Sequence, residues 1–244
     1  MTATGCEGRS TSPEPSATGR PDAGSGEVPG WLRHLARSAE RMNVPAGLRP
    51  PGNGGRRSAI LILFGEAGAG PDVLLVQRSS SLRRHAGQPA FPGGVIDAED
   101  EGPVGAALRE AAEEAGVDPA GVEIVSVLPD LYISRTGYRV SPVLAWWREP
   151  GPVTPGDPAE IASVARVAVA DLADPGRRLM IRYPSGQAGP AFQAGGMLIW
   201  GFTAFVIDQL LAMGGWERPW NAASVVDLPP GVTLTGVDGA APVT

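Results

Sequence analysis

Short apolar runs rich in β-branched side chains recur along the chain from residue 58 onward. Residues 58–64 (SAILILF) and 73–77 (VLLVQ) predict two buried strands, because a Gly- and Pro-rich segment, GEAGAGPD, separates them like a turn. Similar runs predict further strands at residues 122–128, 140–147 and 163–169. With a helix after the second strand, the predicted order is β, β, α, β, β, β.

Three segments carry the signals of helices. Residues 31–42 (WLRHLARSAERM) space their apolar side chains at helical intervals, so they predict a short amphipathic helix. Residues 103–115 predict the strongest helix, since Pro103 suits the opening turn and Gly116 suits the stop. Residues 201–213 (GFTAFVIDQLLAM) are mostly apolar and predict a last helix packed against the sheet.

Composition divides the chain into four parts. Residues 1–26 hold almost no large apolar side chain, so they predict a disordered leader. Residues 27–57 contain the first helix and a connector, and residues 58–215 form the expected catalytic domain. Residues 216–244 are rich in Pro and Gly and predict an irregular tail. A chain of 244 residues, 43% of them hydrophobic, suffices for one sizeable core.

Charge and cysteine content exclude several classes of protein. The net charge is −6, so the broad basic surface of a nucleic-acid-binding protein is not expected. No secretory signal and no run of 18 apolar residues is visible, and we expect no membrane partner. The single cysteine, Cys6, excludes an intrachain disulfide, and a cytoplasmic location fits best. The first and last helices either bury each other or line a homodimer contact.

Three glutamates are gathered in the predicted helix, in the stretch REAAEEAG that begins at Arg109. At 100° per residue, Glu113 and Glu114 lie about −60° and +40° from Glu110, so all three side chains project within an arc of about 100°. One interpretation is a solvated charged face. The other is a site for Mg²⁺ or Mn²⁺, which favour carboxylate oxygens and would offset the repulsion between these side chains.

The surrounding residues resemble the Nudix hydrolase signature, G-x5-E-x7-R-E-U-x-E-E-x-G-U, where U is aliphatic. Between Gly94 and Arg109 the chain holds one residue more than the signature allows. Either Asp100 or Glu101 therefore replaces the first glutamate of the signature, whose role is to hold Arg109. The marked positions are occupied by Gly94, Arg109, Glu110, Glu113, Glu114, Gly116 and Val117.

A longer stretch, residues 74–94 (LLVQRSSSLRRHAGQPAFPGG), resembles the additional motif of the coenzyme A diphosphatase branch of the Nudix hydrolases. That branch also has the lengthened loop, with aspartate at the position of Asp100. Residues 199–204 (IWGFTA) resemble a third motif of the branch, so the resemblance covers about residues 58–211. It implies a Nudix α/β/α sandwich, in which a mixed β-sheet lies between helices.

The resemblance also implies a reaction: metal-dependent hydrolysis of the diphosphate of coenzyme A to 3′,5′-ADP and 4′-phosphopantetheine. Glu110 and Glu114 are the leading ligands for Mg²⁺ or Mn²⁺, and the FPGG turn lets the carbonyl of Gly94 approach the metal. Glu113 is a further ligand or the base that activates water. Some Nudix enzymes take the base from a later loop, where Glu160 is the candidate, although a plain surface charge is the simpler interpretation.

We call residues 74–94 the upstream motif. Its arginine, histidine and glutamine side chains suit phosphate recognition, and each arginine guanidinium presents a fork of donors to phosphate oxygens. A plain solvated loop is the alternative interpretation. Two other functions stay open: a diphosphatase for ADP-ribose or a related nucleotide, and a non-catalytic nucleotide-binding module. The expected substrate-binding residues are Arg78, Arg83, His85 and Gln88.

Overall fold

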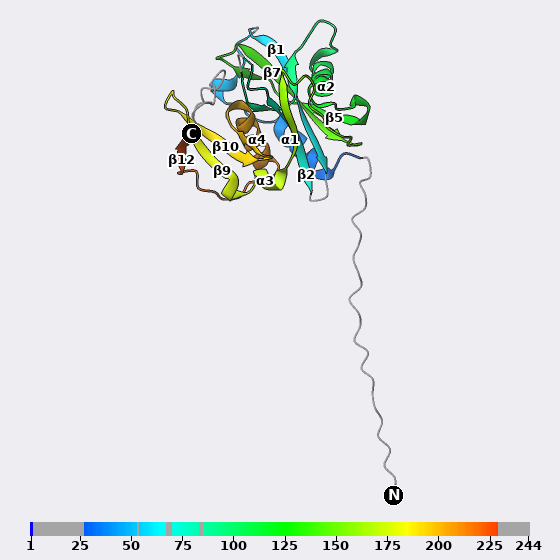
Figure 1. The fold of residues 1–244 in the computed structure, drawn as a ribbon, viewed down its shortest axis with the longest axis vertical. Helices are drawn as coiled ribbons and strands as arrows, with labels where there is room; N and C mark the ends of the chain where they lie inside the picture. The colour runs from blue at the N-terminus through cyan, green and yellow to red at the C-terminus, as the bar shows by residue number, and fades with distance from the viewer. Residues whose placement is uncertain (2–26, 53, 67–69, 83–84, 229–244) are drawn as a thin grey trace.

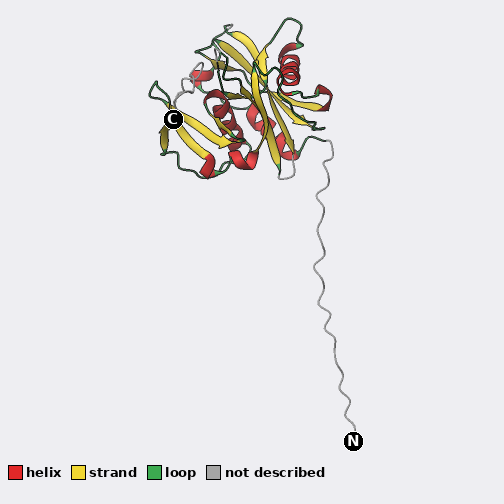
Figure 2. Ribbon diagram, viewed as in Figure 1, coloured by secondary structure: helices red, strands yellow, loops and turns green. Residues whose placement is uncertain are grey.

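The computed structural model describes Met1 and residues 27–52, 54–66, 70–82 and 85–228. The rest of the predicted leader, the end of the tail and Arg83 lie outside these residues. Figures 1 and 2 show the described part as sheets with helices packed against them. The α-helices are α1 (Gly30–Glu40), α2 (Gly102–Ala115), α3 (Val169–Leu172) and α4 (Gly201–Met213).

The central sheet has eight strands and mixed direction. Its path runs β3-β2-β1-β7-β5, and β1 and β7 are parallel while the other pairs are antiparallel. The predicted strands are confirmed as β1, β2, β5, β7 and β8. The eight strands are β1 (Arg56–Glu66), β2 (Pro71–Arg78), β3 (Pro89–Ala90), β4 (Gly93–Val95), β5 (Val122–Val127), β6 (Leu131–Ile133), β7 (Tyr138–Trp147) and β8 (Ile161–Ala168).

Strand β1 changes its neighbour along its length. Its C-terminal end pairs with β2 from Phe64 to Glu66, whereas its N-terminal part pairs with β4 from Ser58 to Ile60. The segment between β2 and β4 therefore runs from the C-terminal half of β1 to its N-terminal half. This path brings the upstream motif next to the start of β1.

Helices cover both faces of the sheet, as the predicted α/β/α sandwich requires. On β1, Leu61 and Leu63 share one core with α2, while Ile62 and Phe64 share the other core with α1 and α4. This alternation is the period of two that a strand buried on both faces imposes on its side chains. Helices α1 and α4 thus bury apolar side chains in the same core. Among the helices described, none is long and apolar enough to span a membrane.

Helix α2 lies close to the sheet because the side chains between them are small. Ala106, Ala107, Ala111 and Ala115 have no exposed surface. The helix ends where the sequence predicts, since Gly116 adopts the left-handed conformation with φ 69°, which an L side chain rarely adopts. The glutamate-bearing face is therefore held at a fixed distance from β1 and β4.

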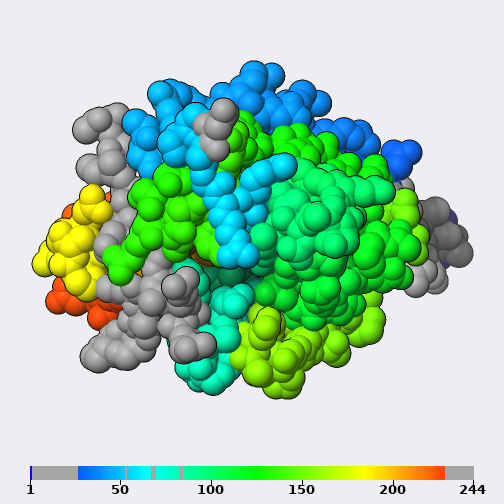
Figure 3. Space-filling view, turned by 90° about the horizontal axis from the view of Figure 1, so that it is seen from above, coloured from blue at the N-terminus to red at the C-terminus, as the bar shows by residue number. Residues whose placement is uncertain are grey.

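A second sheet of four strands was not predicted. Its order is β11-β10-β9-β12, and its last strand comes from the tail that the sequence predicted to be irregular, a prediction that is wrong for residues 225–227. Figure 3 shows segments of this sheet, in yellow and orange-red, on the same face as blue segments of the α1 region and green segments of the α2 region. The strands are β9 (Arg178–Arg182), β10 (Ala188–Ala194), β11 (Met197–Ile199) and β12 (Val225–Asp227).

Arg178 connects the second sheet to the rest of the molecule. Its side chain is 1% exposed and pairs with Asp208 of α4 and, at 3.6 Å, with Glu217. Its guanidinium carbon lies 5.4 Å from the ring centre of Phe192 and 4.5 Å from that of Trp220. These contacts combine charge pairing with cation–π attraction. They hold the segment after α4 against β10, which explains why part of the tail is ordered.

The packing of α2 on β1 yields a first test. Leu63 has no exposed surface, so Leu63→Ala should lower the free energy of unfolding by about 2–5 kcal/mol, as cavities in cores do. Urea unfolding followed by circular dichroism measures this. Val127 is 43% exposed, and Val127→Ala should change stability by less than about 0.5 kcal/mol. Equal losses in the two variants would contradict the described packing.

Candidate active site

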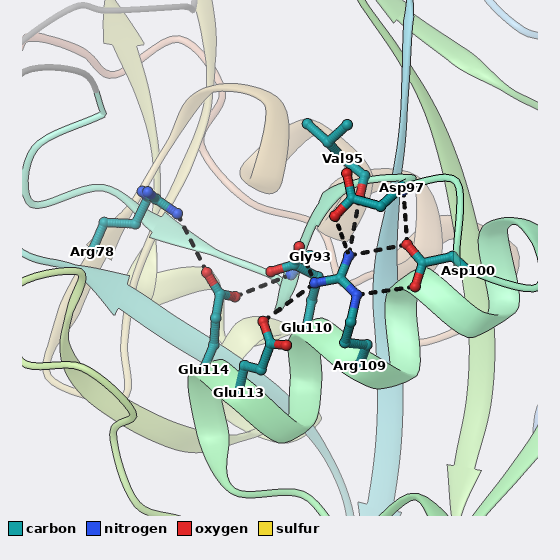
Figure 4. Close-up of polar contacts among 9 residues, drawn as sticks. All are labelled: Arg78, Gly93, Val95, Asp97, Asp100, Arg109, Glu110, Glu113 and Glu114. Atoms are coloured by element: carbon teal, nitrogen blue, oxygen red, sulfur yellow. Dashed lines mark hydrogen bonds and ion pairs between the residues drawn. The ribbon is translucent and has the colours of Figure 1, made fainter.

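Glu114 is the most buried carboxylate of the α2 face. The residue is 6% exposed, and its carboxylate accepts a hydrogen bond from the Gly93 amide at 3.1 Å. Arg78 of β2 lies 3.4 Å from its other oxygen. Figure 4 shows Glu114 between these two partners. Burial raises the pKa of Glu114 to about 7, against the effects of the Gly93 amide and Arg78.

Glu110 and Glu113 differ in their exposure. Glu110 is 17% exposed and lies against Gly94, where a Cβ atom would collide with its carboxylate. Burial raises the pKa of Glu110 as well. Glu113 is 60% exposed and points toward solvent. Arg109 donates to both, at 3.0 Å to Glu110 and 3.2 Å to Glu113.

Asp100, and not Glu101, holds Arg109. Nε and Nη2 of Arg109 donate to the two carboxylate oxygens of Asp100 at 2.9 and 3.0 Å, and Nη2 also donates to the Val95 carbonyl at 3.1 Å. Such a two-point contact fixes the plane of the guanidinium. The hydrogen bond from Arg109 holds the pKa of Asp100 below its usual range. Glu101 is exposed and lies just before α2.

The donor atoms at this face suit Mg²⁺ or Mn²⁺ in chemical type. Glu110 and Glu114 are separated by one helical turn, are largely buried, and adjoin the backbone of Gly94, so the face offers oxygen ligands with little surrounding solvent. Their raised pKa values show that Arg109 and Arg78 do not fully offset the cost of burying charge. Among residues 27–52, 54–66, 70–82 and 85–228, however, no three His, Cys, Asp or Glu side chains are already grouped to hold a metal ion.

Glu160 lies near this face although it comes from the loop before β8. Its backbone carbonyl accepts from the Ser79 amide at 2.7 Å, and the same loop donates from Gly156 to the Glu114 carbonyl at 3.1 Å. Burial is the main reason for the raised pKa of Glu114, and the charge of Glu160 adds to it. The structure thus brings the later glutamate toward the α2 carboxylates.

A cavity of about 310 Å³ adjoins the glutamate face. Gly93 and Gly94 form part of its wall and also contact Glu114 and Glu110, so these two glycines separate the cavity from the carboxylates. Three of the predicted substrate-binding residues line the cavity, namely Arg78, His85 and Gln88. Arg83, the fourth, lies outside the described residues.

The lining side chains have polar atoms that are suited to an anion. Nε of Arg78 is buried and has no hydrogen-bond partner among the described residues. His85 has a positive φ of 57°, which is uncommon outside glycine, and its Nδ1 lies 2.9 Å from Oε1 of Gln88. Arg78 therefore retains donor capacity next to the glutamate face.

Much of the cavity wall was not predicted as part of a site. The hairpin of β6 and β7 contributes Ile133, Thr136, Tyr138 and Val140. Another part of the cavity wall comes from the IWGFTA motif, which the sequence singled out without assigning a role to its residues. That part consists of Trp200, Phe202 and Thr203.

The contact between Asp100 and Arg109 yields a second test. Asp100→Asn removes the charge that orients Arg109, and we expect a loss of about 10- to 100-fold in metal affinity or activity, typical of residues that orient ligands. The thermal midpoint should fall at neutral pH. This difference should vanish as the pH falls through the lowered pKa of Asp100, because the wild-type side chain is then protonated too.

Glu101→Gln is the matched control, since Glu101 is adjacent but exposed. Its activity and thermal midpoint should stay close to those of the wild type. An equal loss in this variant would refute the assignment of Asp100 as the partner of Arg109.

Comparison with known proteins places the chain in a family. The NUDIX domain matches residues 54–184. A protein named "Uncharacterized Nudix hydrolase NudL" from Citrobacter koseri is 48% identical over 100 residues, which cover 40% of this chain and 52% of that protein. Its namesake from Escherichia coli K12 is 54% identical over 74 residues, covering 30% and 38%. The chain thus spans about half or less of the length of these relatives.

Solved structures show a related but partial likeness. A Nudix hydrolase from M. smegmatis, RenU, is 28% identical, with a TM-score of 0.42 over 49% of this chain and 74% of that one. A NUDIX hydrolase from Nitrosomonas europaea is 15% identical, with a TM-score of 0.45 over 73% and 82%. Because the NUDIX domain occupies more than half of its residues, the chain belongs to the Nudix family.

Proposed function

We propose that the protein is a metal-dependent diphosphatase that cleaves coenzyme A or acyl-coenzyme A into 3′,5′-ADP and 4′-phosphopantetheine or its acyl form. One observation carries this proposal: Arg78, His85 and Gln88 of the upstream motif line a cavity whose glycine wall adjoins Glu110 and Glu114. Anion-binding and cation-binding groups thus meet at one place. A cytoplasmic location is part of the proposal and agrees with the single cysteine.

Glu110 and Glu114 would hold Mg²⁺ or Mn²⁺, with the Gly94 carbonyl and Glu113 as further ligands. Nudix hydrolases generally use divalent metal ions. When bound, such ions offset the charge of a diphosphate and lower the pKa of a bound water molecule. Glu110 and Glu114 fit this role because they are one helical turn apart and are largely buried.

Residues of the protein itself orient the carboxylates and contact the substrate. Asp100 fixes Arg109, and Arg109 in turn holds Glu110 and Glu113 by hydrogen bonds. Arg78 reaches Glu114 with Nη1, and its guanidinium has further donors that suit a phosphate group in the adjoining cavity.

Two carboxylates are candidates to accept a proton from water. Glu113 is 60% exposed on α2, and its single described ion pair is with Arg109. Glu160 is exposed in the loop before β8 and contributes to the raised pKa of Glu114. Both carboxylates can exchange protons with solvent, which a general base needs during turnover.

The substrate can be tested directly with the purified full chain. Coenzyme A, acetyl-coenzyme A, ADP-ribose and NADH are each offered with Mg²⁺ or Mn²⁺, and the products are separated by chromatography. We expect 3′,5′-ADP from coenzyme A and its acetyl form, and no comparable turnover of the other two. Faster cleavage of ADP-ribose would overturn the proposed substrate and favour a nucleoside diphosphatase.

The ligand role of Glu114 has a test of its own. Glu114→Gln keeps an oxygen that can accept from the Gly93 amide but removes the charge, so we expect turnover to fall by about 100-fold or more while the circular dichroism spectrum is unchanged. Glu149→Gln removes a charge that is 76% exposed and should behave as wild type. Full activity of Glu114→Gln at saturating Mg²⁺ would refute the role.

A further inference from the structure

The cavity has two walls of different chemistry. Arg78, His85 and Gln88 form the polar wall. The apolar wall comprises the side chains of the β6–β7 hairpin and of residues 200 and 202. Its members are Ile133, Tyr138, Val140, Trp200 and Phe202.

The two walls lie on different sides of β1. In the sheet order, β2 with Arg78 is on one side of β1, whereas β7 and its partner β6 are on the other. Gly93 and Gly94 of β4, which pairs with the start of β1, line the cavity as well. A ligand whose diphosphate lies by these glycines can therefore contact both walls.

Two hydroxyl groups on the apolar side are already hydrogen-bonded within the protein. The Thr203 hydroxyl donates to the Pro89 carbonyl at 3.0 Å, and the Thr136 hydroxyl donates to the Ile133 carbonyl at 3.3 Å. Among the described lining residues, Arg78 alone has a side chain with a permanent positive charge. A phosphorylated group packed against the apolar wall would lose water without gaining a charged partner among the described lining residues of that wall.

We propose that the apolar wall binds the uncharged organic arm of the substrate, so that the nucleotide half lies away from it. This inference rests on the proposed function. In coenzyme A that arm is pantetheine, whose gem-dimethyl group and methylene segments suit contact with apolar and aromatic side chains, whereas the 3′-phosphate of the nucleotide half would have to lose its water there.

Tyr138 is the specificity-determining residue of this wall. It lies opposite Ile133 in the β6–β7 pairing, and both side chains line the cavity. Arg56 steadies the ring, since its guanidinium carbon lies 5.8 Å from the ring centre and its Nη1 lies 3.5 Å from the hydroxyl. With Arg56 over one face of the ring, the part of Tyr138 that lines the cavity can supply contact area for the arm.

Binding of the two separate products distinguishes the halves of the substrate. Calorimetry in the presence of Mg²⁺ measures the affinity of the full chain for 4′-phosphopantetheine and for 3′,5′-ADP separately. Inhibition of coenzyme A cleavage by each product repeats the comparison. We expect Tyr138→Ala to weaken the binding of 4′-phosphopantetheine about tenfold, which is typical of a lost aromatic contact. The affinity for 3′,5′-ADP should stay within about twofold of the wild type. Tyr138→Phe keeps the ring and should restore binding.

Tyr132→Ala is the matched control, because Tyr132 is a tyrosine of the same hairpin, opposite Arg139, and does not line the cavity. It should leave both products unaffected. The inference would be overturned if Tyr138→Ala selectively weakened the binding of 3′,5′-ADP, or if it left the affinity for both products unchanged. Equal weakening of both products would overturn it too.

The outcome also separates this inference from the proposed reaction. If the wild-type chain cleaves coenzyme A but Tyr138→Ala binds 4′-phosphopantetheine normally, the reaction stands and the assignment of the apolar wall fails. If the wild type binds 4′-phosphopantetheine through Tyr138 but cleaves no coenzyme A, the proposed reaction fails and the binding role of the wall stands.

Discussion

The close approach of α2 to strands β1 and β4 is the constraint on which the site depends. It requires that almost no side-chain volume lie between them, and the chain meets it with alanines on the helix and glycines on the strand. A Cβ at Gly94 would meet the Glu110 carboxylate, and one at Gly93 would meet the backbone of Ala59. Small residues at this contact therefore bring helical carboxylates up to the wall of a cavity that lies beyond the strand.

Burial of these carboxylates has an electrostatic cost that the protein only partly offsets. Arg109 and Arg78 supply positive charge, yet the pKa values of Glu110 and Glu114 remain raised because desolvation disfavours the ionised form. A bound cation would supply the remaining compensation. Asp100 matters in the same balance, since it orients Arg109 without being part of the helix.

The cavity joins parts of the chain that are far apart in sequence. Its polar wall comes from the end of β2 and the segment between β2 and β4, and its apolar wall comes from the β6–β7 hairpin and the start of α4. Thr203 bonds to Pro89, and Arg178 ties α4 to the second sheet. The elements outside the glutamate helix thus hold the part of the cavity that we propose for the organic arm of the substrate.

The sequence alone determined the local elements and the chemistry of the α2 face. Helical spacing placed Glu110, Glu113 and Glu114 on one side, because the helical period is fixed by backbone geometry. The continuous apolar run of residues 58–64 indicated a buried strand. Tertiary structure alone decided that Asp100 holds Arg109, that a second sheet forms, and that Tyr138 lines the cavity. These depend on contacts between distant segments, which no local pattern of side chains encodes.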